Sequence, residues 1–233
     1  MNRKNTAIFS SKANTLAYLR PLVKYSQVGD QVTFTVSDWQ ASRGQVLETI
    51  TKRFPDRQLI VRSSAIGEDS TEQTQAGVFR SVKYVESSST KDVMRAVDLV
   101  IESYHDLERA HQVLVQEMLI GVIANGVTFS RHIDSAAPYY QISYDLTAGR
   151  TDTVTSGTSS YETIVVRRGS VDSIADLDET VAPVLPAVQE VETLTGHSAL
   201  DIEFAVTADK IVHLLQARPL VSHGIRHPPL TDQ

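Results

Sequence analysis

The sequence predicts an α+β protein with two lobes, for two reasons. Helical apolar patterns dominate the first half of the chain, whereas strand-like alternation dominates the part that follows residue 112. The chain has 233 residues and is 41% hydrophobic, which is enough to bury one large core or two smaller ones. We therefore expect an N-terminal lobe over residues 1–112, a C-terminal lobe over residues 113–222, and a linker or tail over residues 223–233.

Helices and strands alternate along the expected N-terminal lobe. Apolar residues recur at helical spacing after Ser11, and Pro21 should end or bend that helix. Ser37 and Ser89 each have the spacing of a capping residue before a helical segment. The predicted helices cover residues 11–24, 37–53 and 89–110, and the predicted strands cover residues 31–36, 58–63 and 79–85.

The expected C-terminal lobe consists mostly of strands. A helix is expected over residues 172–194, although Pro183 and Pro186 disfavour a helix in its first part. The last two strands, over residues 200–206 and 210–218, should form a hairpin across a short Thr-Ala-Asp connection. The other segments with β-like composition and alternation cover residues 113–119, 125–131, 138–145 and 162–168.

Composition argues against several classes of protein. The formal net charge of −6 disfavours general nucleic-acid binding through a basic surface. The absence of cysteine excludes disulfides and thiolate metal sites. No apolar segment reaches membrane-spanning length, and the N-terminus lacks the long apolar core of a secretory signal. We therefore expect a cytoplasmic protein that binds neither nucleic acid nor membranes.

The predicted closing hairpin places charged and amide side chains inside an otherwise apolar sheet. Asp201 and Glu203 share one face of a strand, as do Gln216 and Arg218 on the next strand. One interpretation is a structural ion pair between Glu203 and Arg218, since a buried charge needs a partner. The other is a magnesium-phosphate site, because carboxylate and amide oxygens suit Mg²⁺ and arginine can bind phosphate through two hydrogen bonds. The hairpin alone leaves both open.

Arg62 ends a strand-like run and is followed by a segment of small residues. The stretch LIVRSSAIGEDSTEQTQAGV contains serine, alanine and glycine residues whose backbone amides can approach a polyphosphate closely. The alternative is a strand-end arginine that extends into solvent. The acidic residues Glu68, Asp69 and Glu72 would repel phosphate unless they point outward or lie near a metal ion. The pattern therefore permits phosphate binding at Arg62 without requiring it.

Several blocks of the sequence point together to one family. The stretch RSSAIGEDSTEQTQAG resembles the phosphate-loop signature of the phosphoenolpyruvate synthase and pyruvate phosphate dikinase family. Further blocks occur in the order of that family, namely SKANTL, VLVQEML, NGVTFSR, DIEFAV and LLQARPL. The resemblance runs from residue 11 to residue 220. It implies an ATP-grasp fold, in which two lobes with mainly antiparallel sheets flank a nucleotide cleft.

The resemblance also implies roles for the residues that match the family's motifs. Lys12 and Arg62 would hold the phosphates of ATP, and Arg218 would bind the transferring phosphoryl group, so that Arg62 and Arg218 are the expected catalytic residues. Glu203 and Gln216 would ligate Mg²⁺. The adenine pocket would be lined, partly through backbone atoms, by Gln116, Glu117 and Met118.

One region departs from the family's pattern. The glycine-rich stretch expected after the central strands is replaced by PYYQISYDLTAGRTDTVTSGTSS. Its TVTSG segment, residues 153–157, can contact phosphate, close the site, or belong to an ordinary mobile surface loop. This variant resembles the amino-terminal domain of the L-glutamine kinases, which implies that L-glutamine is the final phosphoryl acceptor. The sequence does not define the role of residues 147–160.

The resemblance implies a partner as well as the cofactors ATP and Mg²⁺. In this family ATP phosphorylates a histidine on a separate domain, which carries the phosphoryl group to a small-molecule acceptor and leaves AMP and phosphate as by-products. The sequence shows no recognisable carrier domain after Pro219. We therefore expect a phospho-carrier histidine domain, either in the same polypeptide or on another. The alternatives are a non-catalytic nucleotide sensor and an interaction module whose charges pair with one another.

Overall fold

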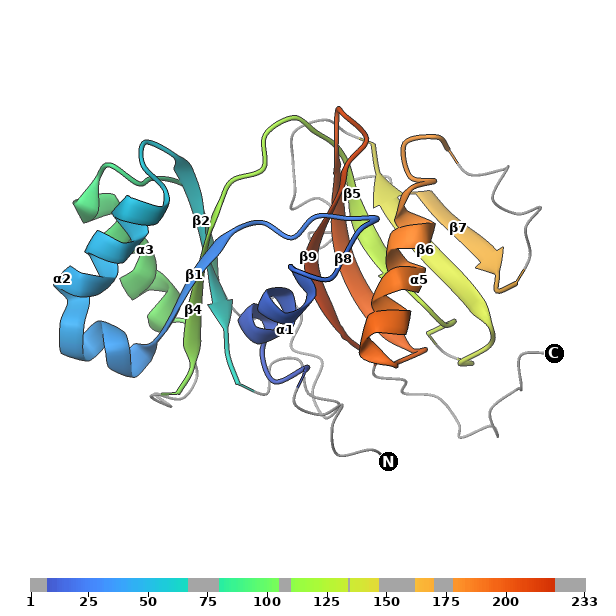
Figure 1. Cartoon of the computed structure of the whole chain (residues 1–233), viewed down its shortest axis with the longest axis horizontal. Coiled ribbons are helices and arrows are strands. Elements are labelled where there is room, and N and C mark those ends of the chain that lie inside the picture. Colours follow the sequence, from blue (N-terminus) through green and yellow to red (C-terminus); the bar gives the residue numbers. More distant parts are fainter. Residues whose placement is uncertain are drawn as a thin grey trace.

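The computed structural model shows two lobes, each built on an antiparallel sheet (Figure 1). The structure describes residues 8–66, 80–104, 110–133, 135–146, 162–169 and 178–220. Within these ranges the elements are, in chain order, α1 (Lys12–Leu19), β1 (Gln31–Thr35), α2 (Val36–Arg53), β2 (Gln58–Ser64), β3 (Ser81–Glu86), α3 (Thr90–Ile101), β4 (Gln112–Glu117), β5 (Val122–Phe129), β6 (Tyr139–Asp145), β7 (Glu162–Arg167), α5 (Val184–Thr195), β8 (Leu200–Thr207) and β9 (Val212–Pro219). The predicted α+β class is confirmed.

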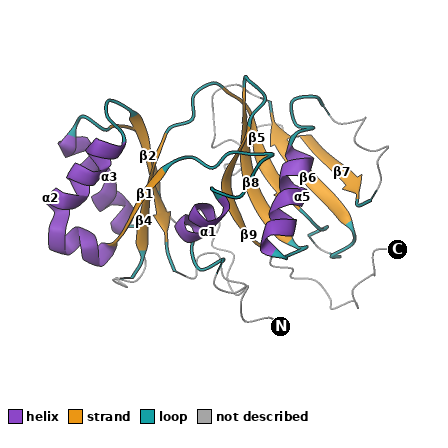
Figure 2. Cartoon of the chain, in the orientation of Figure 1, coloured by secondary structure: helices purple, strands orange, loops and turns teal. Residues whose placement is uncertain are grey.

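The first lobe is a four-stranded sheet with the order β1-β4-β2-β3. Helices α2 and α3 cover its outer face (Figure 2), and one hydrophobic core lies between them and the sheet. Strand alternation directs Leu59, Val61, Val113 and Val115 into this core. The other face of the sheet carries Arg62 and is turned towards α1 and the second lobe (Figure 1).

The start of α2 differs from the prediction. The helix is capped by Thr35 rather than by Ser37. The Thr35 side chain accepts a hydrogen bond from the backbone N–H of Asp38, and the Asp38 carboxylate accepts one from the N–H of Thr35. This reciprocal capping box lets strand β1 pass into the helix without an intervening loop.

The long helix expected after Ser89 begins there but is shorter than predicted. Ser89 caps α3 by accepting a hydrogen bond from a backbone N–H in the first turn. The helix ends at Ile101 rather than near Ala110. Just past that end, the hydroxyl of Ser103 donates to the backbone oxygen of Val100 at 2.6 Å. Side-chain competition of this kind for a backbone carbonyl favours helix termination.

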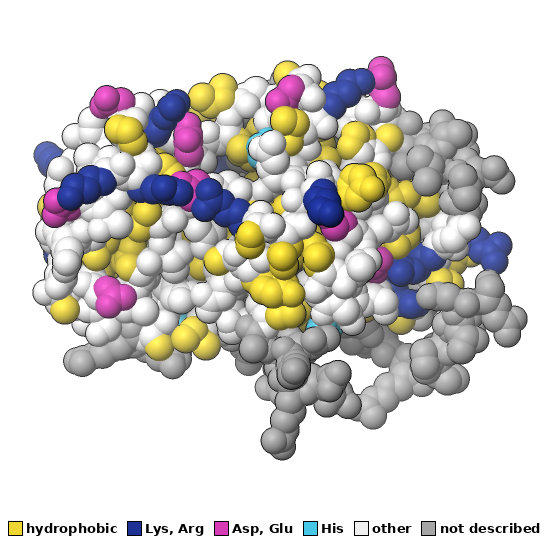
Figure 3. Space-filling view, in the orientation of Figure 1, with side chains coloured by type: hydrophobic (Ala, Val, Ile, Leu, Met, Phe, Trp, Pro, Cys, Tyr) yellow, Lys and Arg dark blue, Asp and Glu magenta, His cyan; other side chains and the backbone are white. Residues whose placement is uncertain are grey.

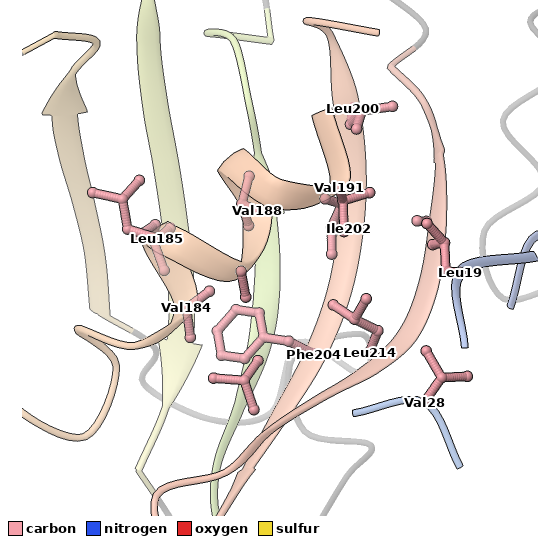
Figure 4. Close-up of a cluster of buried hydrophobic side chains, with 14 of the residues drawn as sticks. Leu19, Val28, Val184, Leu185, Val188, Val191, Leu200, Ile202, Phe204 and Leu214 are labelled. Atoms are coloured by element: carbon pink, nitrogen blue, oxygen red, sulfur yellow. The ribbon is translucent and has the colours of Figure 1, made fainter. Parts of the chain in front are cut away.

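The second lobe is a five-stranded sheet with the order β7-β6-β5-β8-β9, in which β8 and β9 form the predicted hairpin. Helix α5 packs across one face, and Figure 4 shows Val188 and Val191 of α5 close to Ile202 and Phe204 of β8. A helix was expected over residues 172–194. Residues 171–177 lie outside the described residues, and among the described residues that follow, the helix begins at Val184.

The two prolines of this segment fall where a helix tolerates them. Pro183 is the N-cap of α5, and Pro186 lies in the first turn. Backbone N–H groups in the first turn have no acceptor within the helix, so a proline there removes no helical hydrogen bond. The prolines therefore mark where α5 starts and do not interrupt it.

Helix α1 belongs to the core of the second lobe. Leu16, Leu19 and Val28 are buried in the same cluster as the residues of α5 and β8, and Figure 4 shows Leu19 and Val28 near Leu214 of β9. The backbone of Gln27 extends the sheet, donating to Val212 at 2.8 Å and accepting from Leu214 at 2.9 Å. The N-terminal segment is thus a structural part of the second lobe.

The expected boundary at residue 112 therefore needs two corrections. Helix α1 precedes that boundary but packs with the second sheet, whereas β4 follows it and pairs with β1 and β2 in the first sheet. Strands β1 to β4 all belong to the first sheet, and the chain passes to the second sheet between Glu117 and Val122. It also crosses between the lobes from Leu19 to Gln31, where Asp30 forms ion pairs with Arg20 and Arg53.

Charged side chains of both signs cover the visible face of the first lobe. Figure 3 shows a row of Lys and Arg side chains across this lobe, with Asp and Glu side chains among them. Ion pairs in this lobe include Lys52 with Glu48 at 2.7 Å and Arg43 with Asp98 at 3.4 Å. None of the helices within the described ranges is both long enough and apolar enough to cross a membrane.

Candidate functional site

Arg62 lies where the two sheets approach each other. Its side chain is on the face of β2 opposite to the core that contains Val61. Its Nη1 donates a hydrogen bond to the backbone oxygen of Leu215 on β9 at 2.8 Å. Its Nη2 lies 3.6 Å from Oε2 of Glu203 on β8, and the Arg62 side chain is only 11% exposed. Arg62 of the first sheet therefore contacts the closing hairpin of the second.

An irregularity in the β8–β9 hairpin provides the acceptor for Arg62. The register shifts just after the opposed pair Glu203 and Gln216, which leaves Leu215 without a directly opposed residue on β8. An extra residue of this kind interrupts the ladder of hydrogen bonds and bends the strand. The carbonyl oxygen of Leu215 is thereby available to the guanidinium of Arg62.

The structure pairs Arg218 with Asp201 and not with Glu203, the partner that one of the two sequence-based interpretations had given it. The two residues oppose each other in the register, and Nε and Nη2 of Arg218 lie 2.9 and 2.8 Å from Oδ2 of Asp201. Burial raises the pKa of Asp201; Arg218 opposes the rise, and the charge of Glu203 adds to it, so the pKa stays above its ordinary value. Glu203 forms its ion pair with Arg62 instead.

The oxygen donors of the hairpin match the ligand preferences of Mg²⁺. Glu203 and Gln216 are directly opposed, and Asp201 lies on the same face of β8. Gln216 is 5% exposed, whereas the Glu203 side chain is 31% exposed. Among the described residues, no group of three or more His, Asp and Glu side chains is placed to hold a metal ion. A magnesium ion here would therefore need oxygen ligands besides the carboxylates, namely the amide oxygen of Gln216 and oxygens of phosphate and water.

Sequence reasoning missed polar side chains on the neighbouring strands of the same face. The register opposes Asn125 of β5 to Asp145 of β6, and these residues are 3% and 4% exposed. Ser143 lies in the row that begins at Glu203, and its Oγ is 3.0 Å from Oγ1 of Thr163 on β7. The available signal was in PYYQISYD, where Gln141, Ser143 and Asp145 occupy every second position; on β5 only Asn125 adds a polar side chain to this face, beside Val127 and Phe129.

Lys12 begins α1, and the first turn of this helix is attached to the first sheet. Ser11 caps the helix with its side chain. The backbone N–H of Ala13 donates to Oγ of Ser64 on β2 at 2.9 Å. Lys12 itself is 7% exposed. The start of α1 therefore lies beside Ser64 at the end of β2, and Ser64 follows Arg62 by two residues.

The segment expected to line the adenine pocket ends β4 and starts the crossing to the second lobe. Gln116 is 7% exposed, and alternation places its side chain on the face that carries Arg62. The Glu117 side chain is directed to the other face, where Oε1 lies 3.5 Å from Nη1 of Arg57. The N–H of Met118 donates to β2 at 2.8 Å. On the face that carries Arg62, Glu117 can therefore contact a ligand only through its backbone atoms.

The structure brings together most of the residues that the resemblance singles out. Arg62, Glu203, Gln216 and Arg218 lie on the facing surfaces of the two sheets, and Lys12 lies at the adjoining start of α1. Two predicted elements lie outside the described residues: residues 67–79 of the small-residue segment and the TVTSG segment at residues 153–157.

Three solved structures resemble this one over nearly the whole chain. They are the D-alanine–D-alanine ligase from Coxiella burnetii (TM-score 0.51, 15% identity, 94% of this chain and 50% of that chain), the VanG D-Ala:D-Ser ligase from Enterococcus faecalis (0.50, 14%, 94% and 55%), and the D-alanyl-alanine synthetase A from Vibrio cholerae (0.51, 12%, 93% and 56%). The chain spans about half the length of these structures. No model of a known protein family matches the sequence, and no curated protein matches it at a significant level.

These structural neighbours are ATP-grasp ligases, and the two-lobed α+β arrangement is an ATP-grasp fold. The fold implied by the sequence resemblance is therefore confirmed. At identities of 12–15% the likeness establishes the fold alone. The narrower resemblance to the phosphoenolpyruvate synthase family stays a prediction.

Proposed function

We propose that this chain binds Mg-ATP between the facing surfaces of its two sheets and activates ATP for phosphoryl transfer. The observation that carries the proposal is the contact of Arg62 with the β8–β9 hairpin at Glu203 and Leu215. A cation, a carboxylate and an amide thus meet on one surface although they come from distant parts of the sequence. The ATP-grasp fold supports the same proposal, because the ligases that share it act with ATP.

Each residue of the site has a role that suits its chemistry. Arg62 and Lys12 would neutralise the phosphate oxygens of ATP, and Arg218 would bind the group in transfer. Glu203 and Gln216 would supply oxygen ligands to Mg²⁺, which would draw charge away from the phosphates when bound. Phosphoryl transfer depends on alignment and charge neutralisation more than on covalent catalysis, so these residues are of the kinds the step requires.

The more specific proposal is a phosphotransferase that passes the phosphoryl group to a carrier histidine. The ordered sequence blocks from SKANTL to LLQARPL support it, as they resemble the phosphoenolpyruvate synthase family. In this reaction a histidine nitrogen would attack the β-phosphorus of ATP and release AMP, and water would then cleave the pyrophosphoryl-histidine, which releases phosphate and leaves one phosphoryl group on the histidine. The carrier domain and a small-molecule acceptor, L-glutamine in the narrower resemblance, complete the proposed sequence.

The second candidate is an ATP-dependent ligase, which the D-alanine ligase neighbours favour through the shared fold. A carboxylate acceptor would then attack the terminal phosphorus of ATP and release ADP. A third reading, a nucleotide sensor, would bind Mg-ATP without turnover. The nucleotide product distinguishes the three: AMP indicates the carrier reaction, ADP indicates ligation, and unchanged ATP indicates a sensor.

Calorimetric titration of the chain with Mg-ATP tests the shared first step. Arg62→Ala should raise the Kd about tenfold or more, because a hydrogen bond to a charged group contributes about 1.5–3 kcal/mol. Glu203→Gln should remove the dependence of ATP binding on Mg²⁺. The matched controls are Arg43→Ala and Glu48→Gln, whose side chains are 52% and 61% exposed on α2.

Two results would overturn the assignment. Wild-type chain that gives no binding heat and no thermal shift with Mg-ATP would favour an interaction module with paired charges. If Glu203→Gln lowers the Tm while Mg-ATP binding stays unchanged, Glu203 is only the structural partner of Arg62.

A further inference from the structure

Two side chains bind the end of β2 where the regular sheet stops. The ladder between β2 and β4 ends at the opposed residues Ser64 and Gln112. At this point the backbone N–H of Ser64 donates to the hydroxyl of Tyr104 at 3.3 Å. Two residues later, the N–H of Ile66 donates to Nδ1 of His111 at 3.1 Å. Tyr104 and His111 thus provide acceptors on the side of the chain that follows Arg62.

These two side chains are themselves fixed. Tyr104 is 6% exposed and His111 is 5% exposed, and their rings lie 4.9 Å apart. The hydroxyl of Tyr104 donates to the backbone oxygen of Gln112, and the backbone oxygen of His111 accepts from Val36 at 2.9 Å. Because Nδ1 of His111 accepts from Ile66, it carries no proton in this arrangement.

The same residues attach the first turn of α1. Ser64 accepts from the backbone N–H of Ala13 at 2.9 Å, and Gln112 accepts from the hydroxyl of Ser11 at 2.6 Å. Lys12 lies between these two attached positions. The backbone of Lys12 is therefore held by the residues that end the β2–β4 ladder, and Tyr104 binds both of them.

We infer that Tyr104 and His111 are positioning residues, which fix the end of β2 against the start of α1 and so set the placement of Lys12 relative to Arg62. The inference rests on the proposed function, since it takes those two cations to act on one nucleotide. Tyr104 and His111 do not touch that nucleotide surface directly but act through Ser64 and the backbone of Ile66. Alignment within a fraction of an ångström is what such transfer reactions require.

Variants that change one hydrogen bond at a time test the inference. His111→Phe keeps a buried ring beside Tyr104 but removes the acceptor for Ile66. His111→Asn restores an acceptor at the same distance along the side chain. Tyr104→Phe removes only the hydroxyl. The matched control is His197→Phe, because His197 also contacts an aromatic ring, that of Phe9 at 5.0 Å, but lies just after the C-cap of α5 in the second lobe.

The first measurement is amide hydrogen exchange by NMR in the nucleotide-free chain. Exchange at Ile66 should be about fivefold faster in His111→Phe than in wild type, and near the wild-type rate in His111→Asn, given a net contribution of about 1 kcal/mol per hydrogen bond. Exchange at the Ser64 amide should likewise be faster in Tyr104→Phe than in wild type, by a similar factor. His197→Phe should leave both amides unchanged.

The second measurement is the Kd for Mg-ATP. It should rise about fivefold in His111→Phe and in Tyr104→Phe, and it should recover in His111→Asn. Faster exchange with an unchanged Kd would overturn the inference and leave the proposed function intact. A wild-type chain that binds no Mg-ATP would overturn both, whatever the exchange rates show.

Discussion

The buried ion pair between Arg168 and Glu192 makes the sharpest prediction about stability. Nη1 of Arg168 lies 2.6 Å from Oε1 of Glu192, and these side chains are 17% and 9% exposed. The other oxygen of Glu192 accepts from the hydroxyl of Tyr140 at 2.9 Å, and Nη1 of Arg168 also donates to the backbone oxygen of Ser130 at 2.9 Å. The guanidinium lies over the Tyr140 ring at 4.5 Å.

Replacing Arg168 by methionine would leave the carboxylate of Glu192 buried with Tyr140 as its remaining neighbour in this network. At 2.6 Å and an effective dielectric constant of about 20, the lost attraction is about 6 kcal/mol before solvation is considered. Part of that is offset because the arginine no longer has to be desolvated. We therefore expect Arg168→Met to lower the free energy of unfolding by about 3–5 kcal/mol. Adding Glu192→Gln should recover part of this loss, because the unpaired charge is then removed.

Urea denaturation followed by circular dichroism provides the measurement. A loss below about 1 kcal/mol in Arg168→Met would show that the pair contributes no more than an exposed one. A double variant as unstable as Arg168→Met alone would show that the buried charge of Glu192 is not the cause. Either result would refute the reasoning.

Two further predictions concern the fold. Gly126→Ala should destabilise the protein by about 3 kcal/mol or more, because its methyl group would overlap the backbone oxygen of Ser143, whereas Gly44→Ala in α2 meets no atom within 4 Å and should be neutral or stabilising. Partial burial would raise the pKa of Asp30, but the hydrogen bonds from Arg53 and the backbone of Gln31, together with the charges of Arg20 and Arg53, outweigh it and hold the pKa below its ordinary value. The folded state therefore favours the ionised form, so Asp30→Asn should lower the Tm near neutral pH, and the difference should shrink as the pH falls below about 3.9.

Strands were easier to predict than helix ends, for a physical reason. A strand such as β2 is marked by a run of apolar, mostly β-branched residues from Leu59 to Val61, which a single competing hydrogen bond does not change. A helix end depends on single hydrogen bonds. Thr35 and Ser37 both offer a capping hydroxyl. Thr35 is the N-cap because its side chain and backbone N–H form reciprocal hydrogen bonds with Asp38. Likewise, nothing in the apolar stripe of α3 signals the hydroxyl of Ser103.

The resemblance names residues that the structure brings together, whereas pattern alone does not bring them together. Spacing placed Glu203 and Arg218 on one face, yet it could not give the register that opposes Arg218 to Asp201. The contact of Arg62 with Leu215 depends on a register shift between β8 and β9, which leaves no mark in a stretch of alternating residues. Positions of side chains across two sheets are set by the tertiary structure, which periodicity does not encode.

The place of α1 has a consequence for how the chain is made. Leu16 and Leu19 are fully buried against the second sheet, and Tyr18 donates to the backbone oxygen of Leu194, 176 positions later. On the ribosome, the four-stranded sheet has all of its strands once β4 has emerged, whereas α1 must wait for β8 and β9 with its leucines in water. Helix α1 is therefore synthesised long before the strands that cover it.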